Sequence, residues 1–178
     1  MATEPRNDAP MRAITVQPPW SDAIAWFGKN VENRKGEVAW RGEFYVHAGK
    51  TWNDWGAVDH RVIAAMRAQP EVERFIIGNR LSMEPEIARG AIVAKADLVD
   101  VHRQGLCCDH RCQPWGEVSY LDSRTGEMVA AVHFVMDDIV PVPLPVPCKG
   151  ALTLGWPVPA DVVEAVEAQL AVEVLDAR

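Results

Sequence analysis

The stretch Gly28 to Arg34, with the sequence GKNVENR, carries a cation, a carboxylate and a guanidinium within a few residues. Side chains alternate between the two faces of a strand, so burial of Val31 would place Glu32 and Arg34 together on the opposite face. Lys29 would lie at the mouth of the same surface. The alternative is an exposed strand whose charges only pair with one another, which contributes little energy. The pattern predicts a strand that presents charged groups to a ligand.

The flanking residues predict a short helix before this strand and a second strand after it. Upstream, QPPW at 17–20 leads into a helix that extends to Phe27. Proline suits the first turn of a helix, and Gly28 suits a left-handed C-terminal cap. Downstream, WRG at 40–42 leads into a β-rich run at 43–48 that contains His47.

With PVPCKG at 145–150 and LGW at 154–156, these motifs resemble the ASCH domain, a branch of the PUA-like superfamily. In that family a Q-P-W-like opening, a lysine-glutamate-arginine signature after a glycine, an R-G before a strand that ends in His-Ala, and a late P-V-x-x-K-G…L-x-W segment recur in this order. The resemblance covers roughly residues 11–156. It implies an α+β fold, a PUA-like β-barrel of the ASCH type with surrounding short helices.

Hydrophobic periodicity places the remaining elements. Apolar residues at helical spacing predict an amphipathic helix over 54–68, and a second short helix is expected over 71–79. Strands are expected over 13–16, 91–101 and 129–136. The absence of a βαβ rhythm favours α+β with a curled sheet or barrel.

The sequence divides into three predicted segments. Residues 1–10 are polar and are interpreted as a disordered lead-in, residues 11–156 as the ASCH (PUA-like) domain, and residues 157–178 as a C-terminal helical appendix. Asp161 can cap that helix, and its apolar stripe would pack on the domain or, alternatively, form a dimer contact.

Length and composition indicate one globular domain. The chain has 178 residues, of which 48% are hydrophobic. No apolar run approaches the roughly 18 residues that cross a membrane, and residues 1–10 lack the layout of a signal peptide. The expected location is therefore the cytoplasm, with no membrane partner.

The charge distribution favours a small anionic ligand. A net charge of −7 argues against a large duplex-binding surface. Residues 28–50, however, hold five cations against three carboxylates, whereas residues 157–178 hold five carboxylates against one arginine. The expected partner is therefore single-stranded RNA or a nucleotide or nucleoside at the 28–50 face.

Each candidate residue has a chemical role there. Lys29 and Arg34 can hold a phosphate or a base oxygen, and Glu32 can accept from an exocyclic amine or act as a general base if burial raises its pKa. The further candidates for ligand binding are Trp20, by base stacking, and Arg41 and His47.

The family resemblance implies three functions that stay open at this point. The first is an RNA- or modified-nucleobase-binding domain without catalysis. The second is a hydrolase acting on RNA or a modified nucleoside, similar to N4-acetylcytidine amidohydrolases, with Lys29 and Glu32 as catalytic residues. Glu32 stands where those enzymes carry a threonine, so a water activated by Glu32 would replace the hydroxyl nucleophile. The third is a protein or metabolite interaction module.

A cluster of cysteines and histidines suggests a structural zinc. Between His102 and Cys112 lie three of the four cysteines and two of the five histidines. The proposed ligands are Cys107, Cys108, His110 and Cys112, with His102, His133 and Cys148 as further ligand candidates. Such a site would fix the long connection between Gly105 and Gly126. A group of reduced thiols without a metal is the alternative.

Overall fold

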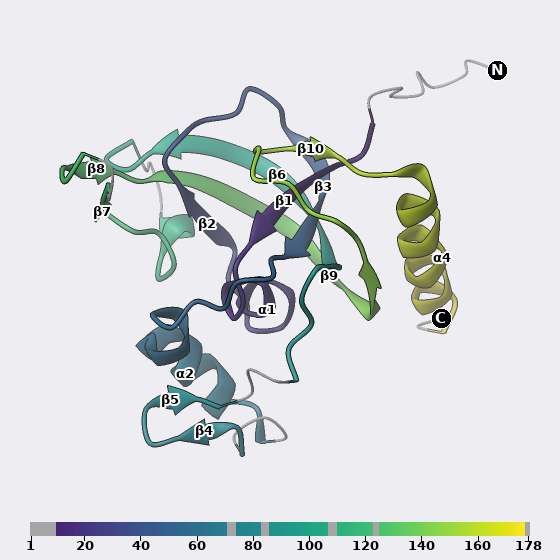
Figure 1. Cartoon of the computed structure of the whole chain (residues 1–178), viewed down its shortest axis with the longest axis horizontal. Coiled ribbons are helices and arrows are strands. Elements are labelled where there is room, and N and C mark those ends of the chain that lie inside the picture. The colour runs from purple at the N-terminus through teal and green to yellow at the C-terminus, as the bar shows by residue number, and fades with distance from the viewer. Residues whose placement is uncertain (1–9, 71–73, 83–85, 107–109, 123–124, 177–178) are drawn as a thin grey trace.

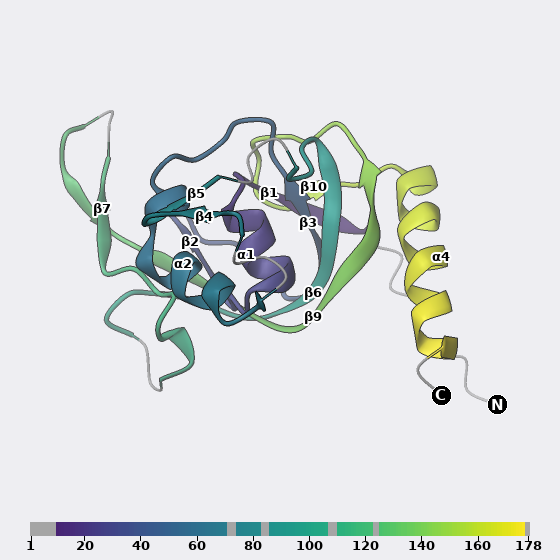
Figure 2. The same cartoon turned by 90° about the horizontal axis from the view of Figure 1, so that it is seen from below.

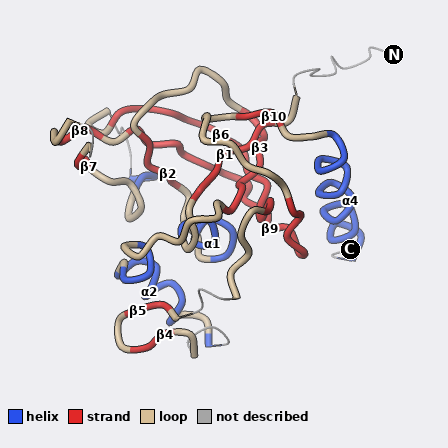
Figure 3. Tube along the Cα trace, viewed as in Figure 1, coloured by secondary structure: helices blue, strands red, loops and turns tan. Residues whose placement is uncertain are grey.

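The structure, a computed structural model, describes residues 10–70, 74–82, 86–106, 110–122 and 125–176. Its centre is a six-stranded mixed sheet in the order β10-β1-β3-β6-β9-β2, around which the helices are arranged (Figures 1 and 3). The strands of this sheet are β1 Arg12–Val16, β2 Val31–Arg34, β3 Gly42–Ala48, β6 Ala91–Arg103, β9 Val132–Pro147 and β10 Trp156–Pro157.

The sheet is open, which corrects the expectation of a closed barrel. Among the described residues, β10 and β2 form its two edges and do not pair with each other. Their lengths explain this, because β10 has two residues and β2 has four, whereas β6 and β9 have 13 and 16. The α+β class is confirmed.

The helices and short elements lie around this sheet. They are α1 Trp20–Trp26, the 3-10 helix η1 Gly56–Val58, α2 His60–Arg67, the 3-10 helix η2 His110–Cys112 and α4 Ala160–Asp176, with the hairpins β4 Ile76–Ile77 to β5 Arg80–Leu81 and β7 Ser119–Leu121 to β8 Met128–Ala130. Seen from two directions, the β7–β8 hairpin and α4 lie at opposite ends of the molecule (Figures 1 and 2). No helix in the described part of the chain is both long and apolar enough to cross a membrane.

Three hydrophobic clusters fill the structure. The first packs α1 against the sheet through residues such as Ile24, Phe44 and Phe134. The second joins the opposite side of α1 to α2, β2 and the segment that carries Cys112 and Trp115. The third lies on the outer face of the sheet, where Val162 and Val166 of α4 pack beside Tyr45 and Ile92.

Two predicted helices differ from the structure. The helix expected over 54–68 begins only at His60, because the Asp59 side chain accepts a hydrogen bond from the backbone N–H of Arg61 and caps α2. Of the helix expected over 71–79, residues 71–73 lie outside the described residues, and residues 74–79 are not helical. Ile77 pairs with Arg80 across a two-residue Gly78-Asn79 loop, which is a hairpin connection.

The strand expected over 129–136 is two strands, and the second continues to Pro147. Its prolines, at alternate positions from Pro141 to Pro147, have no N–H to donate. They are tolerated because β2 pairs only with residues 132–135 of β9, which leaves the rest of that edge without a strand partner.

Candidate functional site

Strand β2 presents its side chains as the alternation predicts. Gly28, with a φ of +71°, turns the chain from α1 toward β2, a conformation that favours glycine. Val31 is fully buried, and the Glu32 and Arg34 side chains lie together on the other face, with 3.2 Å between Arg34 Nε and Glu32 Oε1.

Lys29 and Glu32 form a buried ion pair. Lys29 Nζ donates to Glu32 Oε2 at 2.8 Å and to the carbonyl oxygen of Val31, and the two side chains are 3% and 13% exposed. Burial lowers the pKa of Lys29, against the opposing charge of Glu32. Burial also raises the pKa of Glu32, but the charges of Lys29 and Arg34 outweigh it and hold that pKa below its ordinary value. The condition for Glu32 as a general base, a raised pKa, is therefore not met.

The ion pair forms part of the wall of a small cavity of about 170 Å³. Its lining residues are Trp20, Lys29, Glu32, Asn33, Arg61, Trp115 and Glu117. Lys29 Nζ lies 5.8 Å from the centre of the Trp20 ring, within the range of a cation–π contact. The volume is below the roughly 300–1,000 Å³ of pockets for drug-sized ligands. It suits a single ring system.

Arg61 lines the cavity and is fixed by carboxylates. It donates to both oxygens of Asp59 and to Glu117 Oε1, and its guanidinium carbon lies 5.9 Å and 5.6 Å from the ring centres of Trp20 and Trp115. Every cation of the lining thus has a carboxylate partner. The cavity is less cationic than residues 28–50 suggest, and it suits a neutral base better than a phosphate.

The other predicted ligand-binding residues lie outside this cavity. Arg34 Nη2 donates to the carbonyl oxygen of Thr15 at 2.6 Å and so links β2 to β1. Arg41 donates to the carbonyl oxygens of Val38, Trp40 and Val101.

His47 is buried on β3, away from the cavity. Its Nε2 donates to the carbonyl oxygen of Cys148 at 3.0 Å, and the ring packs against Gly150. Burial lowers its pKa, against the effect of that hydrogen bond. The ring is therefore a packed neutral group and does not reach the predicted ligand site.

The predicted zinc ligands are only partly assembled. Cys107 and Cys108 lie outside the described residues, and His110 is exposed. Cys112 is buried beside His102 and His133. The potential ligand atoms of these three side chains lie within 4.8 Å of one another. Cys148 lies elsewhere, beside His47. The structure thus brings Cys112 together with two histidines that stood outside the proposed set of four.

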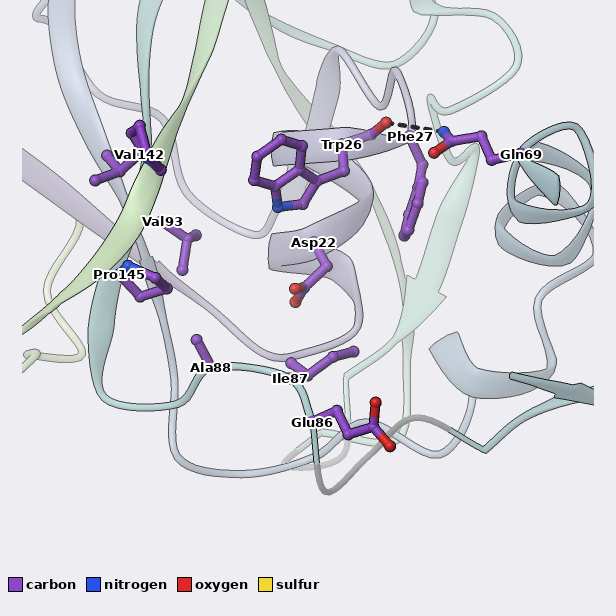
Figure 4. Close-up of a pocket in the computed structure, with 11 residues that line it drawn as sticks. Asp22, Trp26, Phe27, Gln69, Glu86, Ile87, Ala88, Val93, Val142 and Pro145 are labelled. Atoms are coloured by element: carbon purple, nitrogen blue, oxygen red, sulfur yellow. Dashed lines mark hydrogen bonds between the residues drawn. The ribbon is translucent and has the colours of Figure 1, made fainter. Parts of the chain in front are cut away.

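A second and larger cavity, of about 400 Å³, lies on another face of α1 (Figure 4). Its walls are mainly apolar. They include Trp26 of α1, Phe27 at the C-cap of that helix, Ile87, and Val93 and Val142 from the sheet. The Asp22 carboxyl points into it, 8% exposed, and accepts a hydrogen bond from Ser21 Oγ at 3.0 Å. Burial raises the pKa of Asp22 to about 6, against this hydrogen bond. No cation lines this cavity among the described residues, so it lacks the paired chemistry of the smaller one.

The chain is similar in fold to solved structures, among them an ASCH protein. No protein-family model matches the chain, and no curated protein does. The chain is similar to the crystal structure of a tyrosine-to-phenylalanine mutant of ZmASCH from Zymomonas mobilis, at 11% sequence identity and a TM-score of 0.48. The match covers 90% of this chain and 98% of the other. An ASCH protein is thus among the solved structures that the chain resembles.

Sequence reasoning missed Arg61, Trp115, Glu117 and Asp22 as cavity residues. Trp115 and Glu117 stand more than 80 positions after Glu32, and Arg61 comes from α2. The local sequence around them contains no motif that points to β2. The one available signal was the tryptophan content, which does not distinguish Trp115 from the exposed Trp55.

Proposed function

We propose that the protein is an ASCH-type domain that binds one nucleobase of RNA, or a free nucleoside or nucleotide, in the cavity of Trp20, Lys29, Glu32 and Trp115. The observation that carries the proposal is the combination of two tryptophan rings with a buried carboxylate in a cavity of about 170 Å³. Aromatic rings stack on bases at roughly 1–3 kcal/mol per base. The carboxylate supplies a hydrogen-bond acceptor.

Glu32 selects the base in this proposal. Its lowered pKa keeps it ionised near neutral pH, so it accepts hydrogen bonds and donates none. Carboxylates pair with the exocyclic amine of cytosine in nucleic-acid recognition. The expected ligands are therefore bases that carry an exocyclic amine, with uracil as the poorest fit.

Catalysis is not included in the proposal. The lining residues within the described part of the chain include no serine, threonine or cysteine that could act as nucleophile. Glu32 is held by Lys29 and Arg34 in its ionised form, which makes it a weak base for activating water.

Glu32→Gln should weaken binding of cytidine or adenosine monophosphate about tenfold and reduce the preference over uridine monophosphate. The amide keeps the shape of the carboxylate but loses its charge. It also adds an N–H₂ group that can donate a hydrogen bond to uracil O4. Isothermal titration calorimetry over the four ribonucleotides measures both effects.

Glu37→Gln is the matched control, because Glu37 is an exposed acid that pairs with Arg103 and lies outside the cavity. Thermal unfolding of each variant checks that the fold is retained. Equal affinities of the wild type for all four nucleotides, unchanged in Glu32→Gln, would contradict the role of Glu32.

A further inference from the structure

We infer that His102, Cys112 and His133 form a zinc site that fixes the segment 110–118 to the sheet. His102 on β6 and His133 on β9 are direct cross-strand partners, and Cys112 ends η2. Cys112 Sγ lies 3.4 Å from His102 Nε2. Zinc bond lengths in a tetrahedron give about 3.5 Å between sulfur and nitrogen ligands. The donor atoms of all three residues lie within 4.8 Å of one another. A side-chain adjustment of about 1 Å would bring the His133 nitrogen to the distance that a shared zinc ion requires.

Hydrogen bonds orient both imidazoles for a metal. His102 Nδ1 lies 2.7 Å from Asp100 Oδ2, and His133 Nε2 lies 2.8 Å from the carbonyl oxygen of Glu117. A carbonyl oxygen only accepts, so His133 donates through Nε2, and Nδ1 is the nitrogen that would coordinate zinc. His102 faces Asp100 through Nδ1, and its Nε2, beside Cys112 Sγ, is the nitrogen that would coordinate zinc. A carboxylate or carbonyl behind each ligating histidine is the usual arrangement of protein metal sites.

The donor set selects the metal class. Two imidazoles and one thiol suit zinc, whereas calcium and magnesium require oxygen ligands. Cys112 and His133 are 3% and 2% exposed. Three protein ligands leave the fourth coordination position of zinc for a solvent molecule. Cys112 and His133 both line an adjoining cavity of about 250 Å³, which has room for that molecule. Binding would displace the thiol proton of Cys112.

The site would also fix one wall of the nucleobase cavity. Segment 110–118 carries Trp115 and Glu117, and the backbone N–H of Glu117 donates to Asn33 Oδ1 on β2 at 2.8 Å. Gly116 packs so closely against Cys112 and His133 that an added Cβ would lie 2.9 Å from His133 Cε1. This coupling rests on the proposed function, whereas the metal site itself does not.

Elemental analysis of the full chain purified without chelator should find about one zinc per chain. Cobalt substitution should give a thiolate-to-cobalt charge-transfer band, which Cys112→Ser abolishes and which the control Cys148→Ser retains, because Cys148 lies outside the cluster. Asp100→Asn keeps all three ligands and should weaken zinc affinity about 10–100-fold. His102→Gln should abolish tight binding while leaving the buried thiol in place, which separates ligand loss from misfolding.

Failure to bind equimolar zinc, or a cobalt band that survives in Cys112→Ser, would overturn the site. Chelation should also weaken nucleotide binding. An unchanged nucleotide affinity after zinc removal would overturn the coupling, and a zinc-loaded protein that binds no nucleotide would contradict the proposed function while leaving the metal site standing.

Discussion

Lys29→Met should reduce the free energy of unfolding by about 3 kcal/mol, the lower end of the range for breaking one partner of a buried ion pair. The Lys29 ammonium is 3% exposed and lies 2.8 Å from Glu32 Oε2. Its removal leaves the Glu32 carboxylate beside the tryptophan-lined cavity, and the Val31 carbonyl loses a donor. Arg34 Nε, 3.2 Å from Glu32 Oε1, still compensates part of the carboxylate charge. We therefore expect a loss of stability at the lower end of that range. Urea unfolding at pH 7 measures the change.

Two variants show whether the ion pair causes this loss. Lys29→Met/Glu32→Gln should recover at least half of the stability, because no uncompensated charge remains. Arg80→Met is the matched control, since Arg80 is 51% exposed and its carboxylate partner Asp54 is 73% exposed. It should change stability by less than about 0.5 kcal/mol. A loss below about 1 kcal/mol in Lys29→Met would contradict the buried pair.

Asp22→Asn should stabilise the fold by about 3 kcal/mol at pH 8. The pKa of Asp22 is raised from its ordinary 3.8 to about 6 by burial, which corresponds to about 3 kcal/mol of disfavoured ionisation. The amide removes the buried charge and still accepts the hydrogen bond from Ser21.

The pH dependence gives the sign of this effect. A raised folded-state pKa means that the folded protein holds the proton more tightly than the unfolded chain. Asp22 therefore destabilises the fold fully above about pH 6 and not at all below pH 3.8, with the change between these values. The gain in Asp22→Asn should fall from about 3 kcal/mol at pH 8 to below about 1 kcal/mol at pH 4, as measured by urea unfolding from pH 4 to 8. Glu86→Gln, an exposed acid at the same cavity, should show no gain. A gain that is independent of pH would rule out burial of the charge as its cause.

Local patterns predicted β2 and its charged face because strand alternation depends only on neighbouring residues. The placement of Val31 and Glu32 therefore agrees with the structure, and so do the left-handed turn at Gly28 and the strand that contains His47. Lys29 was expected at the mouth of this surface and is instead buried, with its side chain 3% exposed. The hairpin of β4 and β5 was predictable from its Gly78-Asn79 loop, and the error lay in reading that pair as the end of a helix.

Sites made of distant segments were not predictable in this way. The His102–His133 pair depends on the register of β6 and β9, which is shifted by irregularities at three places. The meeting of Trp115 with Lys29 and Glu32 depends on the packing of the second hydrophobic cluster. Neither arrangement can be predicted from the spacing of residues that are close together in the sequence. Likewise, Arg34 and His47 belong to predicted motifs, but tertiary contacts with Thr15 and Cys148 occupy their side chains.

The most direct test of nucleobase binding in this cavity is an NMR titration of the tryptophan indole N–H signals with the four ribonucleoside monophosphates. The indole signals of Trp20 and Trp115 should shift for amine-bearing bases, because these rings line the cavity with Glu32. The signals of Trp26, at the Asp22 cavity, and of Trp55, which is 81% exposed, should stay in place. Shifts of Trp26 alone, or no shift with any nucleotide at millimolar concentration, would contradict the proposed site.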